Sequence, residues 1–159
     1  MTAELTEEKA SEIYQDLLDR ICDAYFVGDF PAFKTAIHTP HTYSTEEKQH
    51  RIENYAQMEQ AFNCFRDYLQ GMGVTDFIRE CTGAAFLAPN RIIGGHKSEL
   101  LRNGTRLREP YTVWATLELL DGVWKVTSSE NAIADTAWQS VAFRQGAAMT
   151  DAPQYPQTE

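Results

Sequence analysis

Three short turn motifs divide the second half of the chain into four apolar-rich segments. Between residues 74 and 131 these motifs are Pro89-Asn90, Asn103-Gly104 and Asp121-Gly122. Asn-Gly and Asp-Gly favour two-residue hairpins, because both central residues of such a turn need a positive φ. The spacing therefore predicts a four-stranded antiparallel meander. A sheet of this length curves, and helices packed on one face of it would enclose a cavity.

Helical periodicity dominates the chain before the meander. Apolar residues recur every four positions in the first segment, expected from Thr6 to near Gly28 with one buried face: Ile13, Leu17, Ile21 and Tyr25. Asp29 is placed to cap a short second helix, which Pro40 stops. A third helix is predicted from about Asn54 to Gln70. Its Met and aromatic stripe is typical of a core face.

Two further segments complete the predicted domain. Residues 41–44 and 50–52 favour a short hairpin around Thr45-Glu46-Glu47, and a helical tail is expected over residues 136–145. Pro and polar residues predict disorder over 146–159. We therefore expect a single domain over residues 1–145.

Charge and size restrict the class of partner. The chain has 159 residues, a 43% hydrophobic content and a formal net charge of −9. This size suits one domain with a real core. The acidity argues against nucleic acid and anionic membrane as partners, since both need a basic surface.

The three cysteines are widely spaced and lie in apolar surroundings: Cys22, Cys64 and Cys81. This pattern matches neither a disulfide framework nor a zinc site, so we expect buried free thiols. The first residues are acidic and polar rather than apolar, and no stretch is long enough for a membrane span. We expect a cytoplasmic protein.

The order of these elements resembles the NTF2-like superfamily, the cystatin-like α+β cone. Two stretches are similar to its SnoaL-like group: residues 25–30 (YFVGDF), which close the first helix, and residues 117–126 (LELLDGVWKV) in the last hairpin. The resemblance covers about residues 7 to 132. It predicts an α+β fold in which a cone-shaped curved antiparallel sheet, the meander plus the short N-terminal hairpin, packs against three N-terminal helices.

The resemblance implies a conical pocket for an unidentified small apolar or aromatic ligand, and commonly a homodimer formed through the sheet. It implies no single activity, because members include isomerases, dehydratases, polyketide cyclases, dioxygenase small subunits and non-catalytic proteins. Steroid-isomerase chemistry is not expected, since Ile21 and Thr45 stand where that group has its Tyr and its base Asp. Large apolar residues on both faces of the predicted strand 111–119 also favour a dimer.

His96 is the first candidate for a catalytic residue. It follows Gly94-Gly95, and strand alternation places it with Ser98 and Leu100 on the face opposite two charged residues. A neutral His in an apolar pocket can accept a proton. The alternative is a core His with one hydrogen bond. A bulge at the glycine pair would reverse the facing.

Glu80 is the second candidate. It shares a face with Ile78 and Thr82. If that face is the concave one, Glu80 is a buried carboxylate and a candidate base. Otherwise it pairs with Arg79 or Arg102 on the outside.

Aromatic and histidine side chains are the expected ligand-binding groups: His41, Tyr43, Tyr14, Tyr25, Tyr55, Phe62 and Trp124. Residues such as Tyr14, Tyr25 and Tyr55 are more often amphipathic core residues with the hydroxyl at the edge of the core. No metal site is expected, because Pro40 breaks the helix that would align His38 with His41. No phosphate loop or redox motif is present, and no cofactor is expected.

We therefore expect a SnoaL-like small-molecule pocket protein. The first hypothesis is a cofactor-independent isomerase, cyclase or dehydratase that acts by proton transfer with His96 as base. The second is a non-catalytic ligand-binding or accessory protein. The third is a small subunit of an oxygenase.

Overall fold

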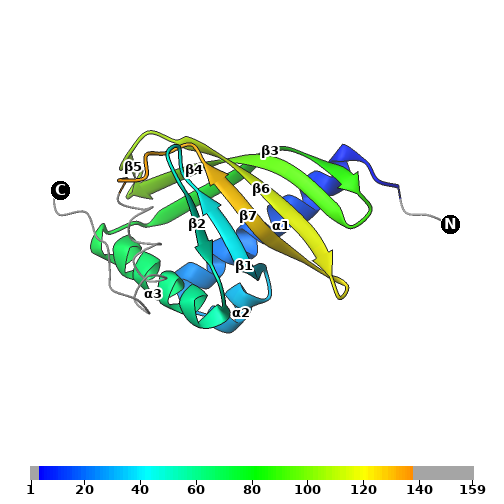
Figure 1. Ribbon diagram of the computed structural model, residues 1–159. Helices are drawn as coiled ribbons and strands as arrows, with labels where there is room; N and C mark the ends of the chain where they lie inside the picture. The colour runs from blue at the N-terminus through cyan, green and yellow to red at the C-terminus, as the bar shows by residue number, and fades with distance from the viewer. Residues whose placement is uncertain (1–3, 138–159) are drawn as a thin grey trace.

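The computed structural model describes residues 4–137, which form one curved sheet with helices on one side (Figure 1). The strand order is β2-β1-β7-β6-β4-β3, and β5 pairs with β4 outside this path. The strands are β1 (Ile37–Ser44), β2 (Gln49–Ile52), β3 (Asp76–Ala88), β4 (Arg91–Arg102), β5 (Thr105–Arg106), β6 (Tyr111–Leu120) and β7 (Val123–Asn131). All neighbours are antiparallel except β1 and β7, which run parallel. The predicted α+β fold class is confirmed.

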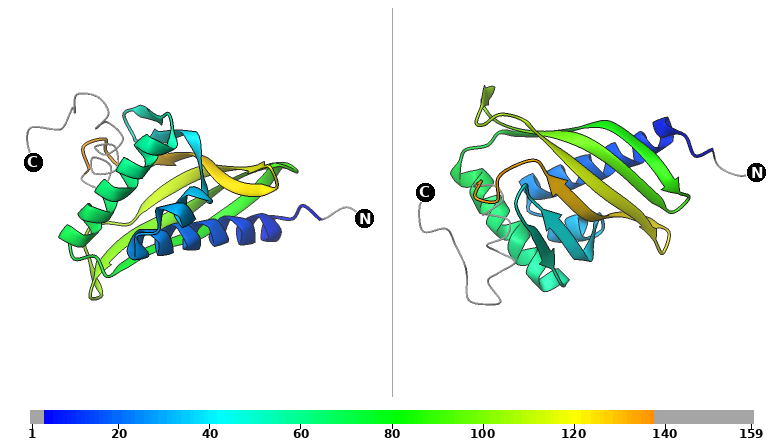
Figure 2. Two further views of the ribbon diagram at one scale, coloured as in Figure 1. Left: turned by 90° about the horizontal axis from the view of Figure 1, so that it is seen from below. Right: turned by 45° about the horizontal axis from the view of Figure 1, so that its top comes forward.

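The helices are α1 (Glu7–Val27), α2 (Phe30–Lys34) and α3 (Tyr55–Gly71). Figure 2 shows α1 running along one face of the sheet, with α3 at one end of it. Thr6 caps α1 and Asp29 caps α2, as predicted, each by accepting a backbone N–H three residues on. Asn54 caps α3 in the same way. Gly28 ends α1 in the left-handed conformation at φ 83°.

The predicted turns are present, with one addition. Asp121 and Gly122 have φ values of 52° and 78° and join β6 to β7, while Pro89-Asn90 joins β3 to β4. Asn103 and Gly104, with φ values of 50° and 83°, lead first into the two-residue strand β5. The chain then crosses to the start of β6. The predicted hairpin of β1 and β2 is also confirmed.

Among the register shifts of the sheet, one in β3 and one in β7 alter which side chains near the cavity face the helices. In β3 the extra residue is Thr82, because Cys81 pairs with His96 and Gly83 pairs with Gly95. In β7 it is Thr127, because Leu117 pairs with Val126 whereas Thr116 pairs with Ser128. Strict alternation along β7 would place Trp124, Val126, Ser128 and Glu130 on one face, and the extra residue ends this alternation at Thr127.

Apolar side chains from α1, α3 and the inner face of the sheet form one core. No helix in the described part of the chain is long and apolar enough to cross a membrane. The helical tail expected over 136–145 lies beyond Ala137 for nearly all of its length, outside the described residues, as does the disorder expected over 146–159.

Candidate functional site

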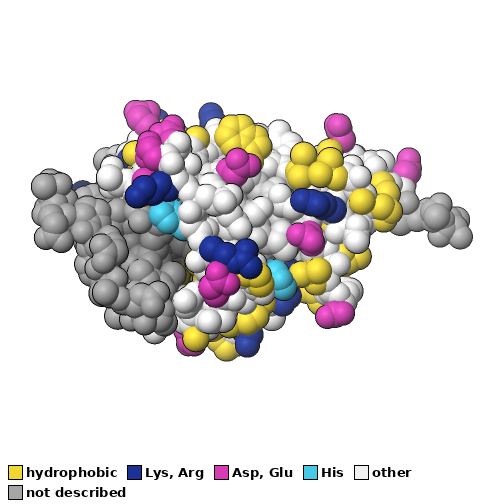
Figure 3. All heavy atoms as spheres, viewed as in Figure 1, with side chains coloured by type: hydrophobic (Ala, Val, Ile, Leu, Met, Phe, Trp, Pro, Cys, Tyr) yellow, Lys and Arg dark blue, Asp and Glu magenta, His cyan; other side chains and the backbone are white. Residues whose placement is uncertain are grey.

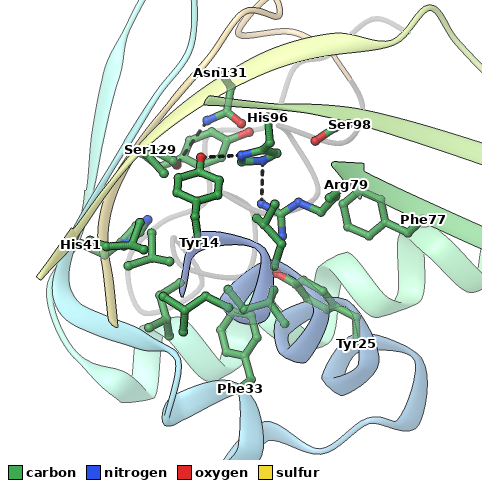
Figure 4. A pocket seen from close by; sticks show the side chains of 18 of the residues that line it. Tyr14, Tyr25, Phe33, His41, Phe77, Arg79, His96, Ser98, Ser129 and Asn131 are labelled. Atoms are coloured by element: carbon green, nitrogen blue, oxygen red, sulfur yellow. Dashed lines mark hydrogen bonds between the residues drawn. The ribbon is translucent and has the colours of Figure 1, made fainter. Parts of the chain in front are cut away.

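A cavity of about 90 Å³ lies between α1 and the inner face of the sheet (Figure 4). Its wall is mostly apolar and aromatic, with contributions from α1, α2, α3 and every long strand of the meander. The polar side chains that line it are Tyr14, Tyr25, His41, Tyr43, Arg79, His96, Ser98, Tyr111, Ser129 and Asn131. A mostly apolar cavity with a few converging polar groups is the usual form of a small-molecule site.

Three of these side chains form a hydrogen-bonded chain across the cavity wall. The Tyr14 hydroxyl lies 2.6 Å from Nδ1 of His96, and an Arg79 guanidinium nitrogen lies 3.1 Å from Nε2 of the same ring. Figure 4 shows these two contacts at the two ring nitrogens of the imidazole. His96 is 1% exposed, so its ring nitrogens depend on these partners.

The contact with Arg79 determines the tautomer of His96. A guanidinium has no lone pair to offer and can only donate, so Nε2 must accept. Nδ1 then carries the ring proton and donates it to the oxygen of Tyr14. The hydroxyl proton of Tyr14 is consequently left to donate to another group.

The surroundings of these three hydrogen-bonded side chains hold them in one protonation state. Burial, with the neighbouring positive charge of Arg79, lowers the pKa of His96 to about 2. Burial also raises the pKa of Tyr14 above its ordinary value, and the charge of Arg79 acts against that increase. Near neutral pH His96 is therefore uncharged and Tyr14 keeps its proton.

Local sequence explains how the three side chains meet. Tyr14 belongs to the buried stripe of α1, which crosses β3 and β4. Arg79 is opposite Ser98 in the β3–β4 ladder, and His96 is opposite Cys81, so both side chains point to the inner face. Gly94, two residues before His96, leaves the room that the ring of Tyr14 occupies.

His41 supplies a second buried imidazole. The side chain is 2% exposed, and its Nδ1 has no hydrogen-bond partner. Burial lowers the pKa of His41 to about 4, while a hydrogen bond to the backbone carbonyl of Val126 acts in the other direction. Because the other ring nitrogen donates to that carbonyl, Nδ1 is an acceptor.

Arg79 is the only side chain with a permanent charge among the described residues that line the cavity. No described carboxylate lies within ion-pair distance of it, and its Nε is buried without a hydrogen-bond partner. Its guanidinium also lies over the ring of Phe77, 5.3 Å from the centroid. In a chain of net charge −9, the cavity thus carries a positive charge.

Solved structures share this architecture. An NTF2-like protein of unknown function from Shewanella oneidensis is 13% identical, with 76% of this chain and 97% of that chain covered and a TM-score of 0.61. An NTF2-like protein with a cystatin-like fold from Novosphingobium aromaticivorans is 16% identical, with 86% and 90% covered and a TM-score of 0.58. The chain has the NTF2-like fold. The predicted resemblance is confirmed at that level.

A third NTF2-like structure has a named activity. It is the hexachlorocyclohexane dehydrochlorinase LinA-type3 from Novosphingobium barchaimii, which is 14% identical, with 76% of this chain and 83% of that chain covered and a TM-score of 0.51. No family model matches the sequence, and no curated protein matches it either. At these identities the likeness extends to the fold alone.

Within this NTF2-like cone, five of the predicted site residues line the cavity: His96, His41, Tyr43, Tyr14 and Tyr25. They come from α1, β1 and β4, three elements far apart in the sequence. The face predicted for His96 is the observed one, because the bulge lies in β3 at Thr82 and leaves β4 regular.

The remaining four lie elsewhere. Glu80 is exposed on the outer face of β3. It is therefore not the buried carboxylate that a position on the concave face would have given. Tyr55 donates its hydroxyl to the backbone of Ile37. Phe62 packs in the aromatic core, and Trp124 packs against Phe86. None of these four lines the cavity.

Arg79, Ser129 and Asn131 are site residues that the sequence did not single out. Arg79 shares its face with Phe77 and Cys81, and these apolar neighbours could have indicated that it points inward. The equally apolar Ile78 on the other face made the inner face of β3 ambiguous. Ser129 and Asn131 reach the cavity only because of the bulge in β7. Among the described residues, no group of three or more His, Cys, Asp or Glu side chains is placed to hold a metal ion.

Proposed function

We propose that the protein is a small-molecule enzyme that moves a proton within its bound substrate, without a cofactor. The observation that carries this proposal is the hydroxyl of Tyr14. Its oxygen accepts the Nδ1 proton of His96, which leaves the proton of this buried hydroxyl to donate to a ligand in the cavity. A fixed donor in a water-poor site stabilises the negative charge that develops on a carbonyl oxygen when an adjacent C–H bond is broken.

His41 is the base in this proposal. Its Nδ1 is a buried acceptor without a protein partner, so it is available to take the proton from the substrate carbon. Its pKa of about 4 makes it a weak base in the empty cavity. Negative charge developing beside it favours the protonated imidazole and therefore raises this pKa. Return of the proton to a second carbon completes an isomerisation, and loss of a leaving group completes an elimination.

His96 has a different role here from the one that the sequence indicated. Its Nε2 accepts from Arg79, and its pKa of about 2 disfavours protonation. We therefore place it as a positioning residue that holds the oxygen of Tyr14. The dehydrochlorinase among the similar structures supports the proposal in one respect, since an elimination is compatible with this fold.

Deuterium exchange tests the proposal without knowledge of the natural substrate. Small cyclic ketones, such as cyclohexanone and 2-cyclohexenone, are incubated with the protein in D₂O, and NMR follows the replacement of C–H by C–D. We expect Tyr14→Phe to slow the protein-dependent exchange by about 10²- to 10³-fold, because a preorganised donor is lost. His41→Gln should abolish it.

Tyr68→Phe is the matched control, because Tyr68 lies on α3 and does not line the cavity. Exchange by the Tyr14→Phe variant at the wild-type rate would contradict the proposal. Binding of ketones with no exchange above the buffer rate would instead favour the non-catalytic ligand-binding function.

We also propose a homodimer formed through the sheet. The face turned away from α1 exposes separate hydrophobic patches among charged side chains (Figure 3). Trp114 is 54% exposed on this face, Ile93 is exposed near it, and Ile78 is exposed further along β3. Sedimentation velocity decides between monomer and dimer.

A further inference from the structure

We propose that the ligand of this cavity is a small organic carboxylate whose anionic group binds Arg79. The inference deepens the proposed function, since it names the chemical class of the substrate in the same cavity. It rests on the charge and the hydrogen-bonding capacity of Arg79, which the proton-transfer step itself does not require.

The first argument is the unbalanced charge. Buried charged groups in proteins are normally paired, because an unpaired charge loses its hydration without compensation. The Arg79 side chain is half-buried, its guanidinium lines the cavity, and its Nε is fully buried. No carboxylate of the described residues lies within ion-pair distance. An anionic ligand supplies the missing partner.

The second argument is the inventory of donors. A guanidinium has five N–H groups, and Arg79 uses them on His96 and on the sulfur of Cys22, which leaves others free. Its Nε is buried and has no partner. A carboxylate accepts two parallel N–H groups from one side of a guanidinium, and this bidentate pair matches the unsatisfied Nε and a neighbouring terminal nitrogen.

The third argument is the composition and size of the remaining wall. Leu17, Ile21, Phe33 and Leu117 give the body of the ligand an apolar environment. One water molecule, with a single heavy atom, needs roughly 10–15 Å³ of cavity volume. A cavity of about 90 Å³ therefore holds about six to nine heavy atoms. A benzoate-sized acid fits this estimate, and no acidic side chain of the described lining repels it.

Calorimetric titration with benzoate and with its neutral analogue benzamide tests the inference. The two probes share shape and differ in charge. We expect the wild-type protein to bind benzoate about 10- to 100-fold more tightly, the range expected for hydrogen bonds to a charged group. Arg79→Met should remove this preference and leave benzamide binding nearly unchanged, whereas Arg79→Lys should keep part of it.

Lys97→Met is the control, because it removes one positive charge from the exposed side of β4. Equal affinity of the wild-type protein for the two probes, or no binding of benzoate, would overturn the inference whether or not the Arg79 variants fold. An unchanged benzoate preference in a folded Arg79→Met variant would overturn it as well.

The two proposals fail separately. Selective benzoate binding without deuterium exchange on the neutral ketones or on a keto carboxylate such as 4-oxopentanoate supports the carboxylate site and contradicts the proton-transfer function. Exchange on ketones that Tyr14→Phe slows, together with equal binding of benzoate and benzamide, supports the enzyme and contradicts the carboxylate site.

Discussion

Tyr14 lies against β4 because one side chain is missing there. A Cβ built on Gly94 would lie 2.7 Å from Cε2 of Tyr14 and 2.9 Å from Cβ of Ala84. Both distances are far below van der Waals contact. The glycine therefore allows the helix to approach the strand, and it places the Tyr14 hydroxyl at His96.

Gly94→Ala should consequently damage the site more than the addition of one methyl group suggests. We expect a loss of about 1–3 kcal/mol in the free energy of unfolding, typical of overpacking, and a weaker Tyr14–His96 hydrogen bond. Urea unfolding measures the first effect, and the deuterium-exchange assay measures the second. Gly83→Ala on the neighbouring strand is the control, since a Cβ there meets nothing within 4 Å. Equal stability of the two variants would contradict this explanation.

At the scale of elements, the bulge at Thr127 determines what β7 presents to the cavity. Before the bulge Val126 faces inward, and after it Ser129 and Asn131 do so. The amide of Asn131 donates to the carbonyl of Ser44 at 3.1 Å, which ties β7 to β1. One extra residue thus reverses which side chains point to the cavity in the last residues of β7.

Deletion of Thr127 should restore regular alternation and turn Asn131 outward. We expect a loss of at least about 2 kcal/mol in the free energy of unfolding, because the Asn131 hydrogen bonds are broken and the polar wall of the cavity is replaced. Thr127→Ala keeps the bulge and should cost less, through one bond of its hydroxyl to the carbonyl of Thr116. Chemical denaturation of both variants gives the comparison, and a deletion no worse than the alanine variant would contradict the role of the bulge.

At the scale of the whole molecule, two buried imidazoles connect the cavity to acid stability. The ordinary pKa of 6.5 applies to both in the unfolded chain, whereas in the fold burial lowers it to about 4 for His41 and about 2 for His96. Below pH 6.5 the unfolded state therefore binds protons that the folded state excludes. Stability is present above the unfolded pKa and decreases as the pH falls.

We expect the free energy of unfolding to decrease from about pH 6.5 downward, by up to about 1.4 kcal/mol per pH unit for each histidine. The His41 contribution levels off near pH 4, where it becomes protonated in the fold. His41→Gln should remove about half of the histidine-dependent slope between about pH 6.5 and pH 4. Urea unfolding over this range measures it. His38→Gln should change the slope less, because the charge of His38 is the smallest of the three influences on the pKa of His41. An identical slope in the wild type and His41→Gln would show that His41 is not held neutral.

Local sequence alone determined the elements and the fold class. Caps at Thr6, Asp29 and Asn54, and positive-φ turns at Asn103-Gly104 and Asp121-Gly122, depend on interactions within a few residues. Their positions were therefore predictable without any knowledge of the tertiary structure. The inward facing of His96 was predicted from strand alternation, and it is observed because β4 has no bulge at its glycine pair.

Tertiary structure decided which of those residues form a site. The tautomer of His96 depends on Arg79, and the position of Tyr14 depends on a glycine 80 residues away in the chain. The inward facing of Ser129 and Asn131 depends on a register shift between strands. Pairing register and buried charge are properties of contacts between distant segments, so no local pattern contains them.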